Sequence, residues 1–409
     1  MDSLVVWEVT YMKASTDVMQ NQIFTKPYNF MLVVSVLSYT GHYMLMATVP
    51  LYAKELGGSN VIAGLMVTAL TVSALLFRPL FGSLIDERGR KAVLVIGGII
   101  FVLASVFYCF AGTILFLLVL RILNGIGFSA HTSAAGTIAS DLTPKSRLAE
   151  GMGYYGISII VGTAIGPSLG LSLSNREGFQ SMFLGVLLIW TVGLIFSFLV
   201  NYEGKRMKNT GSNACTELAV ENRKEKSGFL EKTSLFPSLV MFFVSLAFGA
   251  VITFLPSYGV VRGIEPIGSF FVIYSIAVLI SRLTTGKLAD RHGFGIVLVP
   301  SLAALFLSMV ILAFAESMAV VLVAAVFFGI GFGTSYPISN AIVIKLCPEN
   351  RRGAATSTIL ASMDLGIGSG ALIWGAVLEA ADFMTVYLAS SLCAVISILV
   401  YLFFVHKKL

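Results

Sequence analysis

The sequence predicts an all-α membrane protein in which twelve transmembrane helices form two pseudo-symmetric six-helix bundles. Three observations lead to this prediction: the scarcity of charge, the number of long apolar runs, and an internal repeat. Of the 409 residues, 57% are apolar and only 12% are charged, whereas a soluble domain carries about 25% charged residues. So little charge cannot cover a water-exposed surface, and the many Phe and Gly residues suit helices packed in lipid.

Twelve apolar runs are long enough to cross a bilayer, which takes about 20 apolar residues. They lie near 30–52, 61–85, 92–111, 114–139, 149–173 and 180–201, and near 237–260, 266–288, 295–314, 319–345, 353–378 and 384–405. The chain therefore divides into five parts: a cytoplasmic N-terminal segment (1–28), a first six-helix bundle (29–201), a polar cytoplasmic loop (202–234), a second six-helix bundle (235–405) and a cytoplasmic tail (406–409).

The distribution of lysine and arginine predicts the orientation of these helices. With the N-terminus inside, cytoplasmic segments hold 21 of the 27 basic residues, while the outward loops hold three and the helices three. This asymmetry places both termini in the cytoplasm. The first 28 residues have no continuous apolar core before a small-residue cleavage site, so we do not expect them to be a cleaved signal peptide.

The two halves repeat with a constant offset of 204 residues. This offset aligns Arg78, Gly82, Asp86 and Gly89 with Arg282, Gly286, Asp290 and Gly293. It also aligns Gly125, Gly127, Pro144 and Arg147 with Gly329, Gly331, Pro348 and Arg351. Copies of six helices keep the same orientation, so the pseudo-two-fold axis runs along the membrane normal, as it does in one class of transporters.

On these features the chain resembles the major facilitator superfamily over residues 29–405, and three motifs carry the resemblance. The first is the loop between the second and third helices, with its second copy: Gly82, Asp86, Gly89, Arg90 and Lys91, and then Gly286, Asp290, Arg291 and Gly293. The resemblance implies a cytoplasmic charge network that latches the two halves in one conformation. Glu87 stands where a basic residue is usual. The alternative is a tight turn with ordinary cytoplasmic positive charge.

The second motif lies in the fourth helix and comprises Arg121, Asn124, Gly125 and Gly127. A charged side chain inside lipid is costly unless it is paired or faces water, so Arg121 predicts a functional cavity. The resemblance implies that Arg121 lies near the substrate or takes part in proton coupling. A structural hydrogen bond between helices is the alternative.

The third motif lies in the fifth helix and consists of Gly153, Gly162, Gly166, Pro167 and Gly170. Glycines at this spacing, together with a proline, permit a bent helix and close helix packing. The motif resembles the antiporter signature of proton-coupled exporters, although Leu171 replaces the frequent final glycine. It implies export by proton antiport; a proton-coupled uptake symporter and a lipid flippase of the same fold remain alternatives.

A proton carrier must change charge near physiological pH, and arginine does not do so. Asp364 is the only carboxylate well inside a helix, so it is our first candidate, with a structural role near the cytoplasmic gate as the alternative. His42 and His131 titrate in the right range; His42 shares a polar helical face with Tyr39, whereas His131 is expected to be structural. The resemblance adds Arg121 as a coupling residue.

The candidate cavity residues are polar and aromatic side chains on the helices: Tyr39, His42, Tyr43, Arg121, Asn124, Phe128, Tyr154, Tyr258, Tyr274, Tyr336 and Asn340. Two further arginines, Arg78 and Arg282, lie near the cytoplasmic edge. Snorkelling to the interface explains such positions, and a gate role is the alternative. Three arginines against one carboxylate make the interior positive, which favours an anionic or zwitterionic substrate.

Several other classes of protein are excluded or disfavoured. No cluster of nucleophile, base and orienting residue indicates an enzyme, and no phosphate-binding loop indicates direct use of ATP. Four cysteines without a short spacing indicate neither a disulfide framework nor a metal site. The net charge of +6 is too small to suggest nucleic acid. We expect a monomer in the bacterial inner membrane that uses no cofactor, only the proton gradient, and whose partners are protons, lipid and a small-molecule substrate.

Overall fold

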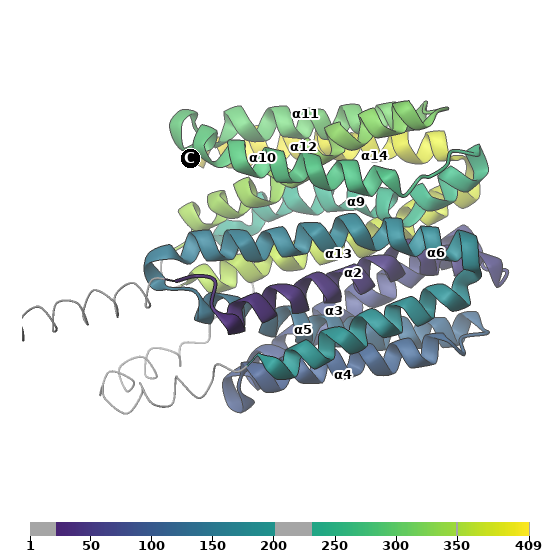
Figure 1. Ribbon diagram of the computed structural model, residues 1–409. Coiled ribbons are helices and arrows are strands. Elements are labelled where there is room, and N and C mark those ends of the chain that lie inside the picture. The colour runs from purple at the N-terminus through teal and green to yellow at the C-terminus, as the bar shows by residue number, and fades with distance from the viewer. Residues whose placement is uncertain (1–21, 201–230, 349–350, 409) are drawn as a thin grey trace, which may run out of the picture.

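The computed structural model describes residues 22–200, 231–348 and 351–408, and their regular structure is helical (Figure 1). The long helices are α2 (Lys26–Glu55), α3 (Asn60–Arg88), α4 (Arg90–Tyr108), α5 (Ile114–Leu142), α6 (Leu148–Leu199), α9 (Leu235–Arg262), α10 (Ser269–His292), α11 (Phe294–Ala313), α12 (Met318–Leu346), α13 (Arg352–Ala380) and α14 (Phe383–Val400). Short 3-10 helices lie at Lys145–Arg147, Lys232–Ser234 and His406–Lys408, and a short π-helix lies at Tyr401–Val405. Most of the predicted N-terminal segment and central loop falls outside the described residues.

Within the described residues, ten helices are long and apolar enough to cross a membrane. One of them, α6, has 52 residues, or about 78 Å at 1.5 Å per residue, which is more than twice the thickness of the hydrocarbon. Its backbone leaves the helical region at Gly178, where φ is 82° and ψ is 170°, so α6 supplies two crossings. α10, whose apolar part Ser269–Thr285 is shorter, supplies the twelfth. The predicted all-α membrane fold is confirmed.

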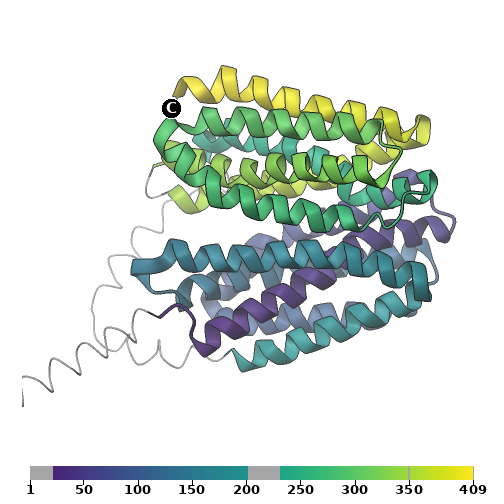
Figure 2. The same cartoon turned by 45° about the horizontal axis from the view of Figure 1, so that its top comes forward.

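The helices form two bundles, which Figure 2 shows as a purple-to-teal half and a green-to-yellow half. The first half comprises α2–α6 and the second comprises α9–α14. The start of α2 and the end of α14 lie at the same end of the molecule (Figure 1), which we call the terminal side. The other end, called the opposite side, holds the start of α3 and the end of α13.

Glycines allow the same close helix contact in each half. An added Cβ would lie 2.6 Å from an atom of α2 at both Gly162 and Gly166 of α6. At the equivalent Gly366 and Gly370 of α13, it would lie 2.4 and 2.5 Å from backbone oxygens of α9. Real Cβ atoms do not approach so closely, so larger residues would push these helices apart. The spacing of the third motif therefore has a packing reason that both halves share.

The internal repeat extends to the backbone of its loop glycines. Gly89, between α3 and α4, has φ 90° and ψ 158°, and Gly293, between α10 and α11, has φ 90° and ψ 157°. Side chains other than glycine are excluded from this region by contact of the Cβ atom with the backbone. The glycine in each copy of the first motif is therefore required by the sharp turn between two helices.

Gly89→Ala is expected to destabilise the fold, because strain in this backbone region costs about 1–3 kcal/mol. The measurement is the melting temperature of the purified protein in detergent. Gly112→Ala is the matched control, since Gly112 has no positive φ and an added Cβ there would meet no atom within 4 Å. Equal melting temperatures for the two variants would contradict the assignment of strain to Gly89.

Large apolar side chains cover the outside of the bundle. Five of them are at least 68% exposed: Leu76, Phe110, Leu115, Leu188 and Leu283. A soluble monomer rarely exposes so much apolar surface, whereas lipid accommodates it at no cost. This surface therefore faces the bilayer.

The two halves meet on the opposite side, where α3 packs against α13. The backbone amide of Asn60 donates to Glu379 Oε2 at 2.8 Å, and Thr68 Oγ1 donates to the carbonyl oxygen of Gly368 at 2.7 Å. An added Cβ on Gly64 would lie 2.1 Å from the carbonyl oxygen of Ala371. This close contact closes the space between the halves on the opposite side.

Candidate functional site

A cavity of about 790 Å³ lies between the two halves. Small-molecule sites typically measure about 300–1,000 Å³. Its lining runs from Met46 and Thr71, inside the bundle, to Gly82 and Met152, near the terminal-side ends of α3 and α6. The contact of α3 with α13 closes the other end. The cavity is therefore reached from the terminal side.

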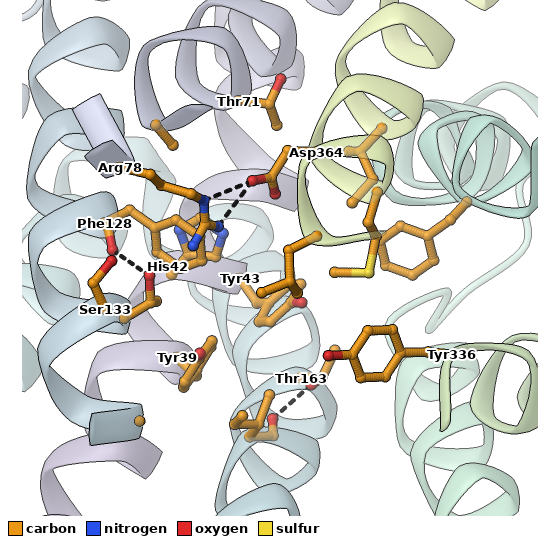
Figure 3. A pocket seen from close by; sticks show the side chains of 18 of the residues that line it. Tyr39, His42, Tyr43, Thr71, Arg78, Phe128, Ser133, Thr163, Tyr336 and Asp364 are labelled. Atoms are coloured by element: carbon orange, nitrogen blue, oxygen red, sulfur yellow. Dashed lines mark hydrogen bonds and ion pairs between the residues drawn. The ribbon is translucent and has the colours of Figure 1, made fainter. Parts of the chain in front are cut away.

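An ion pair joins the two halves across the cavity, between the level of Thr71 and that of Gly82. Both Nε and one terminal nitrogen of Arg78 approach Asp364 Oδ2, at 2.9 and 2.8 Å (Figure 3). Arg78 belongs to α3 and Asp364 to α13, so this pair continues the contact between those helices. Asp364 is only 7% exposed, and it is the one carboxylate in the cavity lining that the structure describes.

The snorkelling expected of Arg78 is therefore wrong. Its side chain is 21% exposed and turns inward to Asp364 instead of outward to the interface. The reason is electrostatic: a buried carboxylate is stable as an ion only with a partner, and Arg78 is placed to supply one. The structural role left open for Asp364 is thus present as a cross-link between α3 and α13.

A second arginine, Arg282 of α10, lines the cavity without such a partner. Its side chain is exposed to the cavity space, and it forms no ion pair with any residue that the structure describes. An added Cβ on Gly156 would lie 3.2 Å from one of its terminal nitrogens. Among the described lining residues, Arg78 and Arg282 against Asp364 leave one positive charge in excess when the histidine is neutral.

Aromatic rings form much of the remaining lining. The rings of His42 and Phe128 stack with centroids 3.9 Å apart at 13°, and the ring of Tyr39 meets Phe128 edge-on at 6.1 Å. In the second half, Phe248 and Phe332 stack with centroids 4.5 Å apart. A mostly apolar wall with a few convergent charges suits an amphipathic ligand.

Several residues singled out from the sequence come together here. The lining includes Tyr39, His42, Tyr43, Phe128, Tyr274, Tyr336 and Asp364. Figure 3 shows Tyr39, Tyr43 and Tyr336 around the space beside the ion pair. The aromatic and titratable candidates on α2, α10, α12 and α13 therefore share one cavity.

Three other cavity candidates lie toward the opposite side, beyond the closed end. Arg121 is fully buried, and its terminal nitrogen donates to the carbonyl oxygen of Leu45 at 2.7 Å. Asn124 is also fully buried, one turn further along α5. The hydroxyl of Tyr258 donates to two backbone carbonyl oxygens near the end of α11. The prediction that these three line the cavity is wrong for this conformation, because Arg121 and Asn124 are buried inside the first half and Tyr258 inside the second.

Two more candidates lie near the terminal side but outside the lining. The ring of Tyr154 packs against Phe24, with centroids 4.8 Å apart, and its neighbour Tyr155 lines the cavity instead. Asn340 lies one turn beyond Tyr336 on α12 and is half-buried outside the lining. The prediction for Tyr154 is therefore wrong by one residue, since Tyr155 lines the cavity in its place. The prediction for Asn340 is wrong by one turn, since the lining of α12 includes Tyr336 and not Asn340.

Sequence reasoning missed lining residues on several helices. They include Thr71, Ser133, Tyr155, Thr163, Phe248 and Phe332. On α6 a signal was present, because Met152, Tyr155, Ile159 and Thr163 recur every three or four residues and so share one helical face. Ser133 and Thr71 gave no such signal, since isolated hydroxyl residues are common inside membrane helices.

Arg121→Gln is expected to lower the stability of the protein rather than its affinity for a substrate. The guanidinium joins α5 to α2 through Leu45, and a hydrogen bond from a charged group contributes about 1.5–3 kcal/mol. The melting temperature and the substrate affinity of the purified variant are the two measurements. Arg176→Gln, at an exposed arginine, is the control. Weaker substrate binding at an unchanged melting temperature would place Arg121 in the transport path instead.

The basic residues of the first motif make their described contacts within the first half. Arg90 Nε lies 3.4 Å from Asp141 Oδ2 at the end of α5, and Lys91 Nζ donates to the carbonyl oxygen of Phe198 at 2.9 Å. Gly82 lines the cavity, and Arg291 is exposed. The side chains of Asp86 and Asp290 and the surroundings of Gly286 lie outside the described set. Arg90 and Lys91 therefore tie α4 to α5 and α6 in this conformation, in which the terminal side is open.

The glycines of the third motif differ in their surroundings. Gly162 and Gly166 face α2, as described above, and an added Cβ on Gly170 would lie 3.1 Å from the side chain of Thr48. Gly153 has open space around it, and Pro167 lies inside α6. Because α13 makes the same contact with α9, this geometry serves packing and carries no direction of transport by itself.

Comparisons with known proteins agree with the fold. The sequence profile of the Major Facilitator Superfamily matches residues 31–273 and 266–408. The Staphylopine export protein of Staphylococcus aureus (strain Mu50) is 24% identical over 394 residues, which cover 93% of this chain and 96% of that protein. The multi-drug resistance efflux pump PmrA homolog of Lactococcus lactis is 25% identical, with 87% and 89% covered.

Solved structures show the same fold at low sequence identity. The inward open conformation of the xylose transporter XylE from E. coli superimposes with a TM-score of 0.75 at 16% identity, covering 94% of this chain and 96% of that one. The nucleoside transporter NupG superimposes with a TM-score of 0.67, also at 16% identity, over 92% of this chain and 98% of that one.

Proposed function

The chain belongs to the major facilitator superfamily, and from that premise we propose that it exports a small amphipathic molecule, anionic or zwitterionic, in exchange for protons. It is a multi-pass membrane transporter and not an enzyme. The proposal adds the direction of transport, the coupling ion and the class of substrate. The observation that carries it is the cavity between the halves, whose wall is aromatic and whose charge is positive by one.

The class of substrate follows from the charges in the cavity. Arg78 is neutralised by Asp364, whereas Arg282 faces the cavity without a described ion-pair partner. A guanidinium binds a carboxylate or a phosphate through parallel hydrogen bonds, and a partly dry site strengthens this interaction. The aromatic wall adds favourable burial for an apolar part of the same molecule.

The direction is supported by the relatives and by the side on which the cavity opens. Two relatives that match most of this chain are named for export or efflux. We place the terminal side in the cytoplasm, because positive charge gathers there. An exporter must take up its substrate from the cytoplasm, and a cavity reached from the terminal side fits that step.

Proton coupling is assigned to Asp364. Opening of the opposite side requires α3 to separate from α13, and the Arg78–Asp364 ion pair lies on the path of that separation. A proton on Asp364 would remove the charge that holds Arg78. Asp364 in this way connects the proton to the movement of the two halves, while the proton gradient supplies the energy.

The test is transport by the purified protein in liposomes with an imposed pH gradient. A fluorescent pH reporter is read while drugs, sugars, amphipathic anions, zwitterions and metal chelates are added in turn. We expect a compound that carries an anionic group to collapse the gradient with the sign of antiport, and the charges beside that group are considered in the next subsection. Movement of the compound in the same direction as the proton would make the protein an uptake symporter, and activity only on labelled lipids would make it a flippase.

A further inference from the structure

The internal repeat leaves one position of the cavity without its expected charge. Arg78 and Arg282 are equivalent under the offset of 204 residues, and the residue equivalent to Asp364 in the first half is Ile160. Arg78 thus has a carboxylate on the facing helix of the other half, whereas Arg282 has an isoleucine. Ile160 lines the same cavity and is 8% exposed.

The surroundings of Arg282 agree with this symmetry. Gly156 lies one helical turn before Ile160 on α6, and an added Cβ there would lie 3.2 Å from a terminal nitrogen of Arg282. The arginine therefore reaches toward the segment of α6 that corresponds to the Asp364 segment of α13. Among the described residues no carboxylate stands beside Arg282 as Asp364 stands beside Arg78, and Arg282 lines the cavity.

Only one of the two carboxylate oxygens of Asp364 pairs with another residue that the structure describes. Both contacts of Arg78 go to Asp364 Oδ2. Asp364 Oδ1 has no hydrogen-bond partner among the described residues. This oxygen is not fully buried, and since Asp364 lines the cavity, it faces cavity space. Tyr43, Tyr336, Asp364 and Arg282 all line the cavity, which places the two charges in one continuous site.

The sign of coupling then selects the charge of the ligand. A purely anionic ligand binds better when Asp364 is protonated, because the negative charge of Asp364 repels it; the ligand and the proton would then travel together. A ligand ammonium group binds better when Asp364 is ionised, so the ligand and the proton would alternate. Antiport in a positive cavity therefore requires both a carboxylate and an ammonium group on the ligand.

We propose that the substrate is a zwitterion whose carboxylate pairs with Arg282, on the side of the cavity where the internal repeat has Ile160 instead of a carboxylate, and whose ammonium group pairs with Asp364 Oδ1. This inference rests on the proposed function for the sign of coupling. Arg78 of α3 contacts Asp364, and Tyr43 of α2 and Tyr336 of α12 line the same cavity; of these three only Arg78 is charged at neutral pH. At Asp364 the ammonium group of the ligand therefore competes only with Arg78 and with the proton.

The test is equilibrium binding to the purified full-length protein in detergent, with three fluorescent probes on one scaffold. Nε-dansyl-lysine is the zwitterion, its methyl ester the cation, and its Nα-acetyl derivative the anion. We expect the zwitterion to bind at least tenfold more tightly than either of the others near neutral pH. Equal or tighter binding of the ester, or no binding by any of the three, would overturn the proposal.

Variants identify the site. Arg282→Gln should reduce binding of the zwitterion to the level of the ester, whereas Arg262→Gln, on the opposite side, should change nothing. Ile160→Asp should have the same effect as Arg282→Gln, because the new carboxylate neutralises Arg282 from within. Ile160→Asn, which changes the shape almost equally without the charge, should retain tight binding. Loss of binding in Ile160→Asn together with Ile160→Asp, or retention in Arg282→Gln, would contradict the carboxylate site.

The binding assay needs neither a membrane nor a gradient, so it fails independently of the transport assay. If the zwitterion binds best but liposomes show symport, the charge pattern of the site stands and the proposed exporter fails. If liposomes show antiport but the ester binds best, the exporter stands and the inference fails.

Discussion

Asp364→Asn is expected to abolish transport driven by a pH gradient while preserving exchange at equal pH when the substrate is saturating. The asparagine keeps an oxygen that accepts a hydrogen bond from Arg78, so the contact between α3 and α13 survives. It cannot gain or lose a proton, so the gradient has no group on which to act. The measurement compares gradient-driven uptake and equilibrium exchange of the same labelled compound in liposomes.

The control for this variant is Glu177→Gln, which removes an exposed carboxylate in the segment that turns back to the second crossing of α6. It should preserve both activities. Full gradient-driven activity in Asp364→Asn would dismiss Asp364 as the proton carrier and return His42 and His131 to consideration. Loss of both activities would assign Asp364 to the structure of the site rather than to coupling.

A disulfide across the closed side is expected to stop transport completely and reversibly. An added Cβ on Gly368 would lie 3.4 Å from Cβ of Thr71, close to the ~3.5–4.5 Å that a disulfide requires. Thr71→Cys with Gly368→Cys, in a background without the four native cysteines, should therefore form a bond between α3 and α13. Because the opposite side cannot then open, oxidation should remove transport and reduction should restore it.

Each single cysteine variant is the control for this experiment and should transport equally before and after oxidation. Binding of a substrate from the terminal side should survive in the oxidised double variant, because the cavity stays open there. Transport by a fully cross-linked protein would show that α3 and α13 need not separate, which is incompatible with alternating access between the two halves.

The fold could be predicted almost completely from the sequence, for physical reasons that act locally. A membrane helix needs about 20 apolar residues regardless of its neighbours, so each predicted run coincides with a described helix. The internal repeat could be recognised because the sharp turn between two helices requires glycine in each half, at Gly89 and at Gly293. The break of α6 at Gly178 needed no special signal beyond the length of the apolar run.

The site could be predicted only in part, because its contacts join residues that lie far apart in the sequence. The aromatic candidates on α2 were found from helical phase, but the partner of Asp364 was not, since Arg78 is 286 residues away and snorkelling explained it equally well. Arg121 was expected in the cavity because it is charged and within the membrane. Its burial depends on how α5 packs against Leu45 of α2, and no single segment encodes that packing.

The most direct test of the account is the release of protons when a substrate binds. Purified protein in detergent and weak buffer, with a pH indicator, is mixed with a compound that the liposome assay has identified. Competition between substrate and proton at Asp364 predicts that binding releases protons from the wild-type protein and that Asp364→Asn releases none. Uptake of protons on binding would mean that substrate and proton are bound together, and it would contradict the proposed antiport.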